Sequence, residues 1–242
     1  MKRKHRHELK QNDFLVWMEN TFEWISENRR QLYTGLGIGV AAAVLLGGAY
    51  YYVNYRQSNA QHVLNEALEL YHGRIQESAV VQSTTGAEFK TIEERYQKSL
   101  EAFENVIDQY SRTSQGRHAR YYAALCHKGL GQYEDAEKLL SEVAAGDHDL
   151  LHYLGTQALA TVKTAAEDYG GAADVYRRLV EDTNNPLPKD ILLFNLAMVN
   201  EQAGNLEEAQ KDYERVLKEF PDSLLKSEVL SRNERLEYRL ES

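Results

Sequence analysis

The hydrophobic and polar positions of this chain follow two different patterns, one up to about residue 55 and another beyond it. Residues 31–55, QLYTGLGIGVAAAVLLGGAYYYVNY, contain no charged side chain. As a helix this run is roughly 37 Å long, enough to cross a hydrocarbon core of about 30 Å. A helix also satisfies its own backbone hydrogen bonds in lipid. The pattern therefore predicts one transmembrane helix over residues 31–55; the alternative, a buried core helix, rarely stays apolar for so long.

The basic residues around this run predict its orientation. The first thirty residues contain seven Lys and Arg side chains, including Arg29 and Arg30 directly before the run, and the twenty residues after Tyr55 contain two. Because basic flanks stay in the cytoplasm, we expect a cytoplasmic N-terminus and a translocated segment from Arg56 onward. Tyrosines at the far end of the run suit the opposite membrane interface.

A cleaved signal peptide is the rival interpretation of the same run. Gly47-Gly48-Ala49 offers small residues for cleavage. A signal peptide, however, has a short charged region and an apolar region of about 7–15 residues, whereas this run is longer and follows thirty residues. Cys126 stands far from a lipoprotein-type cleavage position.

An amphipathic helix is predicted just before the span, beginning at Asn12 or Asp13 and running to about Arg30. Its apolar side chains share one half of the helix surface, and Glu19, Glu23 and Glu27 occupy the other. The apolar set is Phe14, Leu15, Trp17, Met18, Phe22, Trp24 and Ile25. A position on the inner membrane surface is the simplest reading. Since the polar face is acidic, packing against a membrane-protein partner stays open.

Small residues recur at every fourth position of the span. They are Gly35, Gly39, Ala43 and Gly47. Such a stripe lets a second helix approach closely, so it is a candidate helix-packing face, for a second copy or for a partner helix. A single span with no such role is equally consistent with it.

Beyond residue 88 the pattern becomes a repeat. A small residue recurs at Ser99, Ala136, Ala172 and Ala209, at spacings of 37, 36 and 37. A large residue stands three positions before each, at Tyr96, Tyr133, Tyr169 and Leu206. Others follow four and seven positions after each, at Phe103, Leu140, Tyr176 and Tyr213, and at Val106, Val143, Leu179 and Val216. We expect antiparallel helix pairs that approach at the small residue and stack on one another, because no pair can bury its apolar face alone.

These repeats resemble the tetratricopeptide repeat. The best copy is residues 190–223, with Asn195-Leu196-Ala197 in the first helix, Gly204-Asn205 at the turn and Pro221 at the end. A second copy, residues 117–144, contains GQYEDA, and a weaker one covers residues 153–180. The segment 91–110 is expected to be a second helix that pairs with a helix over residues 57–72. The resemblance implies an all-α solenoid that acts as a protein-binding scaffold.

The whole arrangement is similar to the YfgM-type ancillary subunits of the bacterial SecYEG protein-export channel. That resemblance rests on a basic N-terminus, an amphipathic helix, one span and an acidic repeat domain. It implies a single-pass protein of the bacterial inner membrane, with its C-terminal domain in the periplasm near the export channel and periplasmic chaperones. The expected divisions are 1–30, a cytoplasmic tail and helix; 31–55, the span; 56–223, the repeats; and 224–242, a C-terminal capping helix.

Charge and residue chemistry narrow the function classes. Residues 1–30 carry a net charge of +2 and the rest of the chain −11, giving the overall −9. An acidic repeat domain argues against nucleic acid as a partner. No serine elbow, phosphate loop or HExxH motif is present. His148 and His152 could hold a metal only with a third ligand from Asp147 or Asp149, and a buried, inert Cys126 is expected. We therefore expect no enzyme, cofactor or small-molecule substrate.

Protein binding is expected on the first helices of successive repeats. The predicted binding residues are Tyr121, Leu125, Lys128, Gln157, Thr161, Phe194, Met198 and Glu201. Phe194 and Met198 could form an apolar anchor or pack against the capping helix. The favoured function is a periplasm-facing adaptor for protein export or envelope assembly. The alternative is a structural scaffold for cell-division or envelope complexes that self-associates through the glycine stripe.

Overall fold

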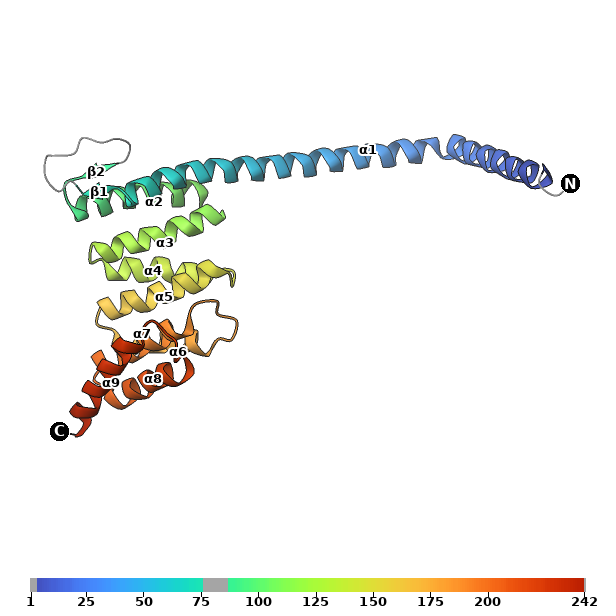
Figure 1. The fold of residues 1–242 in the computed structure, drawn as a ribbon. Helices are drawn as coiled ribbons and strands as arrows, with labels where there is room; N and C mark the ends of the chain where they lie inside the picture. The colour runs from blue at the N-terminus through green and yellow to red at the C-terminus, as the bar shows by residue number, and fades with distance from the viewer. Residues whose placement is uncertain (1–3, 76–86, 242) are drawn as a thin grey trace. The chain divides into compact units, whose positions relative to one another are not determined.

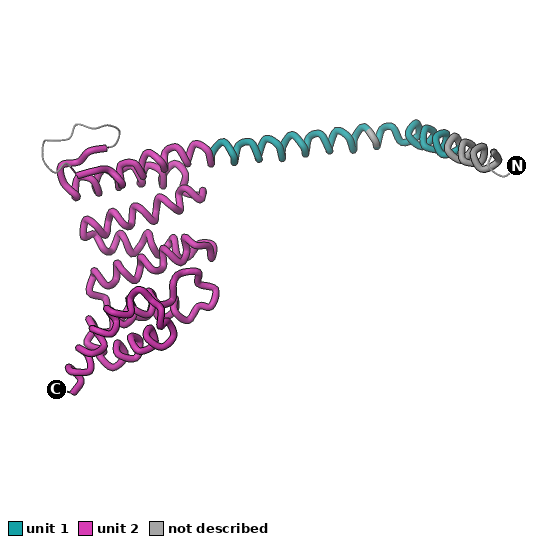
Figure 2. The backbone as a smooth tube through the Cα atoms, viewed as in Figure 1, with its two compact units in different colours: residues 1–56 teal, residues 57–242 magenta. Residues whose placement is uncertain are grey.

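The computed structural model describes the backbone of residues 4–75 and 87–241, with side chains from Val16 onward except Leu32. The chain separates into two compact units, Met1–Arg56 and Gln57–Ser242, coloured teal and magenta in Figure 2. The first unit is helical throughout its described part. The second contains the helix pairs. The fold is all-α, with the repeat region stacked as a solenoid (Figure 1).

Helix α1 runs from Lys4 to Tyr71 without interruption. Asn12 and Asp13 therefore lie inside it, and the prediction that a helix begins there is wrong. The sequence offers no reason for a break, because the three prolines of the chain all follow residue 185 and glycine is tolerated in an apolar helix. The separately predicted helices 12–30, 31–55 and 57–72 are one helix, which ends just before Gly73, where an end was expected.

The exposed apolar side chains of the first unit match the predicted amphipathic segment and span. Trp17, Phe22 and Trp24 are 62%, 64% and 56% exposed, and Ile25 is exposed as well. Phe14 and Leu15, also assigned to the apolar face, lie outside the described side chains. One helical stretch of the described chain, Tyr33–Tyr71, contains a window long and apolar enough to cross a membrane, and none of that window is buried.

A two-residue parallel bridge follows α1. Strand β1, Arg74–Ile75, pairs with β2, Glu88–Phe89, in the register Arg74 to Glu88 and Ile75 to Phe89. The polar run from Ile75 to Gly86 predicts a loop. Ile75 belongs to β1, and residues 76–86 lie outside the described part of the chain. Phe89 is buried, so the bridge anchors this connection to the first helix pair.

The second unit is a succession of helices, each packed on the next. Their bounds are α2 Ile92–Tyr110, α3 Ser114–Gly129, α4 Tyr133–Ala144, α5 Leu150–Ala165, α6 Tyr169–Glu181, α7 Lys189–Gln202, α8 Leu206–Glu219 and α9 Lys226–Glu241. Several begin at a capping side chain that accepts a backbone N–H three residues on. These caps are Thr91, Thr113, Asp149 and Asp168.

The column of small residues lies at the helix contacts, as expected. Ser99, Ala136, Ala172 and Ala209 have no exposed surface. Ser99 satisfies its hydroxyl within its own helix, by donating a hydrogen bond to the carbonyl of Arg95 at 2.7 Å. Their large neighbours four and seven positions later are buried too, and they form apolar cores between successive helix pairs. Helix α1 contributes Leu64 and Ala67 to the first core. The C-terminal end of α1 therefore serves as the first helix of the repeat whose second helix is α2.

The turns of the repeats require a left-handed backbone. Gly131 and Gly204 have φ of 74° and 81° between the two helices of their pairs. Glu167 stands at the same position in the middle pair and has φ of 64°. Glycine adopts this conformation without steric cost, whereas glutamate does not.

Candidate protein-binding surface

The predicted binding residues come from α3, α5 and α7, the first helices of three successive pairs. All eight are partly exposed, neither sealed in a core nor free of neighbours. Helices α3 and α5 contact one another directly, so the predicted residues of these two helices lie on adjacent helices. The assignment of these residues to a binding site stays a prediction.

On α3 and α5 the predicted residues combine an aromatic platform with hydroxyl groups. The ring of Tyr121 meets that of Tyr122 edge-on at 5.3 Å, and burial raises the pKa of Tyr121. Thr161 donates to the carbonyl of Gln157 at 3.0 Å, and its hydroxyl also lies 3.3 Å from the phenol oxygen of Tyr176 on α6. Leu125 and Lys128 complete the row on α3. The two helices therefore offer a mainly uncharged surface.

On α7 the predicted residues are engaged by α9. The guanidinium carbon of Arg232 lies 5.8 Å from the centre of the Phe194 ring, and Arg232 Nη1 donates to Glu201 at 3.3 Å. Glu201 also accepts from the phenol of Tyr213 at 3.1 Å. Phe194 and Met198 pack against a core that includes Val229 and Leu236 of α9. Phe194 therefore contacts α9 through Arg232, and Met198 packs against the same core. Whether the two residues also form an anchor for a partner stays a prediction.

Ion pairs also connect successive helices of the repeats, and the sequence did not predict them. Lys163 on α5 binds Glu137 of α4 at 3.0 Å and Asp168, the cap of α6, at 2.9 Å. Arg117 on α3 donates two hydrogen bonds of 2.9 Å to Asp149, the cap of α5. A capping aspartate followed by a helix was visible in the sequence, but its distant partner carried no signal there.

The histidine pair does not acquire a third ligand in the described part of the chain. The rings of His148 and His152 lie 4.3 Å apart at an angle of 39°. Among the described residues there is no group of three or more side chains suited to a metal. Cys126 is fully buried, and burial raises the pKa of its thiol to about 12, which suits an inert core residue.

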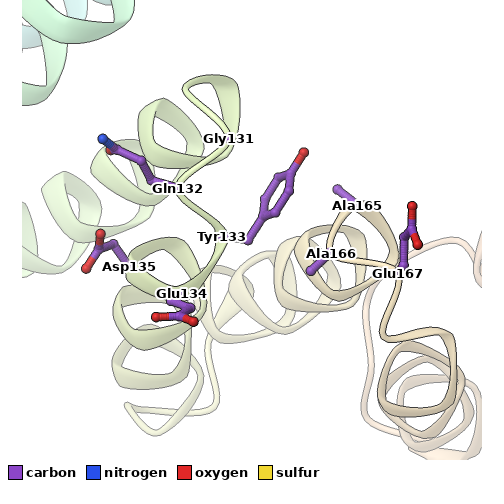
Figure 3. Close-up of a pocket in the computed structure, with 8 residues that line it drawn as sticks. All are labelled: Gly131, Gln132, Tyr133, Glu134, Asp135, Ala165, Ala166 and Glu167. Atoms are coloured by element: carbon purple, nitrogen blue, oxygen red, sulfur yellow. The ribbon is translucent and has the colours of Figure 1, made fainter.

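A pocket of about 540 Å³ lies between the α3–α4 turn and the end of α5, and its lining residues are drawn in Figure 3. The Tyr133 ring points into the space between these two elements, while Gln132 and Asp135 point away from it. Two of the three left-handed residues, Gly131 and Glu167, line it. Its lining residues contain no nucleophile paired with a base, so this pocket presents no catalytic arrangement.

The glycines of the apolar segment have room beside them. A methyl group added at Gly35, Gly39 or Gly47 would meet no atom within 4 Å outside its own helix turn. Ala43 lies on the same exposed stripe. The role of this stripe in helix packing stays a prediction.

Comparison with known families identifies the repeats. Two tetratricopeptide repeat models match, one over residues 93–149, which includes α2, α3 and α4, and one over residues 191–223, which includes α7 and α8. No curated protein matches the sequence significantly. Each matched region contains a helix pair whose turn contains a glycine, Gly131 between α3 and α4 and Gly204 between α7 and α8. The chain therefore contains tetratricopeptide repeats, the helix pairs of a scaffold for protein–protein interaction.

Proposed function

We propose that this protein is a membrane-anchored adaptor whose repeats bind other proteins in the bacterial periplasm, in the service of protein export or envelope assembly. The observation that carries the proposal is the joining, in one chain, of an unburied apolar helical segment and a repeat scaffold. A scaffold of this kind works by holding proteins together, so we expect no intrinsic turnover.

The side of the membrane is supported by charge. Basic side chains concentrate before residue 31, and the repeats are acidic. A reporter fused after Ser242 tests this orientation. Alkaline phosphatase, which is active only when exported, should be active in that fusion, and a cytoplasmic fluorescent reporter at the same position should be dark. The reverse result would contradict the periplasmic assignment.

The face formed by α3 and α5 is the proposed protein-binding surface. It presents Tyr121, Leu125 and Gln157, which are partly exposed. A photocrosslinking amino acid at Leu125 or Gln157 in the full chain should capture partner proteins in living cells. The same amino acid at the exposed position Lys211 of α8 serves as the matched control. Equal capture at all three positions would remove the face from the proposal while leaving the adaptor role standing.

A second candidate function is a scaffold that self-associates through the glycine stripe. The small residues at every fourth position of the apolar segment favour it, because a second helix can approach the backbone along such a stripe. Gly39→Ile should abolish self-association in a membrane dimer assay. Gly37→Ile adds the same side chain off the stripe, at a position that is equally open, and should not. A dimer that persists in the first variant would contradict this candidate.

A further inference from the structure

A groove runs between α2 and α4, with α3 as its floor. Two neighbouring pockets of about 410 and 240 Å³ make up this groove, and Glu104 lines both. It involves α2 and α4, the second helices of their pairs, and is therefore separate from the face proposed above. It will be called the α2–α4 groove.

The α2–α4 groove has an apolar base. Leu100 and Ile107 of α2 and Leu139 of α4 line it, and all three are partly buried against the first core. These side chains supply the hydrophobic surface that an interface needs at its centre.

Its walls are acidic, and most of that charge is not neutralised. Glu104, Asp108 and Asp135 line the groove, and Glu93 lies at one end. Within the described chain none of these four carboxylates has an ion-pair partner. Glu101 and Glu142 also line it but are ion-paired, and Lys138 lines it as well, so the unpaired carboxylates outnumber the unpaired lysine. The guanidinium of Arg120 on the floor is engaged by Glu142 at 2.9 Å and by the carbonyl of Ser111.

In the next repeat, a lysine of the chain itself neutralises the carboxylates at the corresponding position. Lys163 of α5 stands where His127 stands in α3, nine residues before the small residue of its repeat. Lys163 binds carboxylates of both neighbouring helices. His127 instead bonds to the amide oxygen of Gln132 at 2.7 Å. At this position the α2–α4 groove therefore lacks the paired lysine that its neighbour has. Lys138, which lines the groove, is exposed and pairs with no carboxylate among the described residues.

We propose that the α2–α4 groove docks a basic amphipathic segment of another protein. Lysine or arginine side chains of that segment pair with Glu104, Asp108 and Asp135. An apolar side chain between them rests on Leu100, Ile107 and Leu139. Charge complementarity selects this occupant, because an acidic or neutral segment would leave the carboxylates unpaired beside an apolar surface.

The test is binding of a fluorescent peptide that repeats Lys-Leu-Ala-Lys, measured by anisotropy with the full chain in a nonionic detergent and protein-free micelles as the blank. The double variant Glu104→Lys with Asp108→Lys should weaken binding about tenfold. The control, Glu207→Lys with Glu214→Lys, makes the same change in net charge on exposed positions of α8 and should leave affinity within about twofold. Circular dichroism confirms that each variant is folded. If charge reversal unfolds the first variant, Glu104→Gln with Asp108→Asn replaces it.

Three outcomes would overturn the proposal. Equal weakening by the two double variants would reduce the interaction to attraction by net charge. Equal affinity for a peptide in which serine replaces leucine would show that the apolar base plays no part. No binding of the Lys-Leu-Ala-Lys peptide above the micelle blank would leave the groove without the proposed occupant. None of these results bears on the face formed by α3 and α5.

Discussion

Glu167 and Gly131 occupy the same turn position in successive repeats, and both have a left-handed backbone, with φ of 64° and 74°. The turn at Glu167 thus keeps the same backbone conformation although it has no glycine. A side chain with a Cβ in this conformation costs roughly 1–2 kcal/mol. The turn at Glu167 is held by the contacts of α5 and α6 on either side of it.

Glu167→Gly should stabilise the protein. Relief of the backbone strain outweighs the greater freedom that glycine gives the unfolded chain, for a net gain of about 0.5 kcal/mol. Thermal unfolding of the full chain in detergent, followed by circular dichroism, should show a rise in midpoint of about 1–2 °C. A lower midpoint would mean that the Glu167 side chain contributes more than its strain costs.

Gly131→Ala should have the opposite effect. A methyl group there meets no atom within 4 Å, so the loss of about 1 kcal/mol comes from the left-handed backbone alone. Gly170→Ala is the matched control, because that site is equally open and lies in the first turn of α6 with no positive φ. Alanine there should be neutral or stabilising. An equal loss of stability in the two variants would show that the effect of Gly131→Ala does not come from its left-handed backbone.

The pair Arg117 and Asp149 should make stability depend on pH. The hydrogen bonds from Arg117 lower the pKa of Asp149 from 3.8 to about 2. A folded-state pKa below the unfolded one stabilises the protein above about pH 4, and this contribution is lost as the pH falls from about 4 to 2. Because Asp149 is half exposed, we expect no more than about 1 kcal/mol.

Asp149→Asn isolates this ion pair. Asparagine retains a side-chain oxygen for the cap hydrogen bond to the His152 N–H but not the charge. Denaturant unfolding should show the variant less stable than the wild type at pH 7 and equal to it near pH 2. Asp147→Asn, at an exposed neighbour whose carboxylate forms no ion pair with any described residue, should show little difference at pH 7.

Ala209→Leu should destabilise the last repeat by about 1–3 kcal/mol, because Ala209 has no exposed surface and lies where helices α7 and α8 meet. Lys211→Leu adds apolar volume two residues away at an exposed position and should change the free energy of unfolding by less than about 0.5 kcal/mol. Denaturant titration of both variants compares them. Equal effects would show that Ala209 does not limit the approach of the helices.

Cys126 should react with a thiol reagent only when the protein unfolds. Its side chain is fully buried and its pKa is raised to about 12, so little thiolate forms near neutral pH. A chromogenic disulfide reagent at pH 8 should label the native chain slowly and the denatured chain at once. Rapid labelling of the native protein would indicate that α3 opens readily.

Much of the fold could be read from local patterns. The recurrence of Ser99, Ala136, Ala172 and Ala209 marks the helix contacts because close approach of two backbones admits only a small side chain. The uncharged run of residues 31–55 marks a candidate span because length and apolarity alone set that requirement. The candidate binding residues followed from their spacing on the first helices, and whether they bind a partner is a matter for the crosslinking experiment.

Other features depend on residues that are far apart in the chain. No local pattern shows that Lys163 joins Glu137 to Asp168, that Arg232 lies over Phe194, or that Glu104 lines a groove whose carboxylates outnumber its cations. The sequence by itself determined the helices of the repeats, their pairing and the candidate membrane anchor, because these follow from periodicity and side-chain size. Only the tertiary structure decided which charges are neutralised and which surfaces stay open, because those properties arise from contacts between helices that periodicity does not encode.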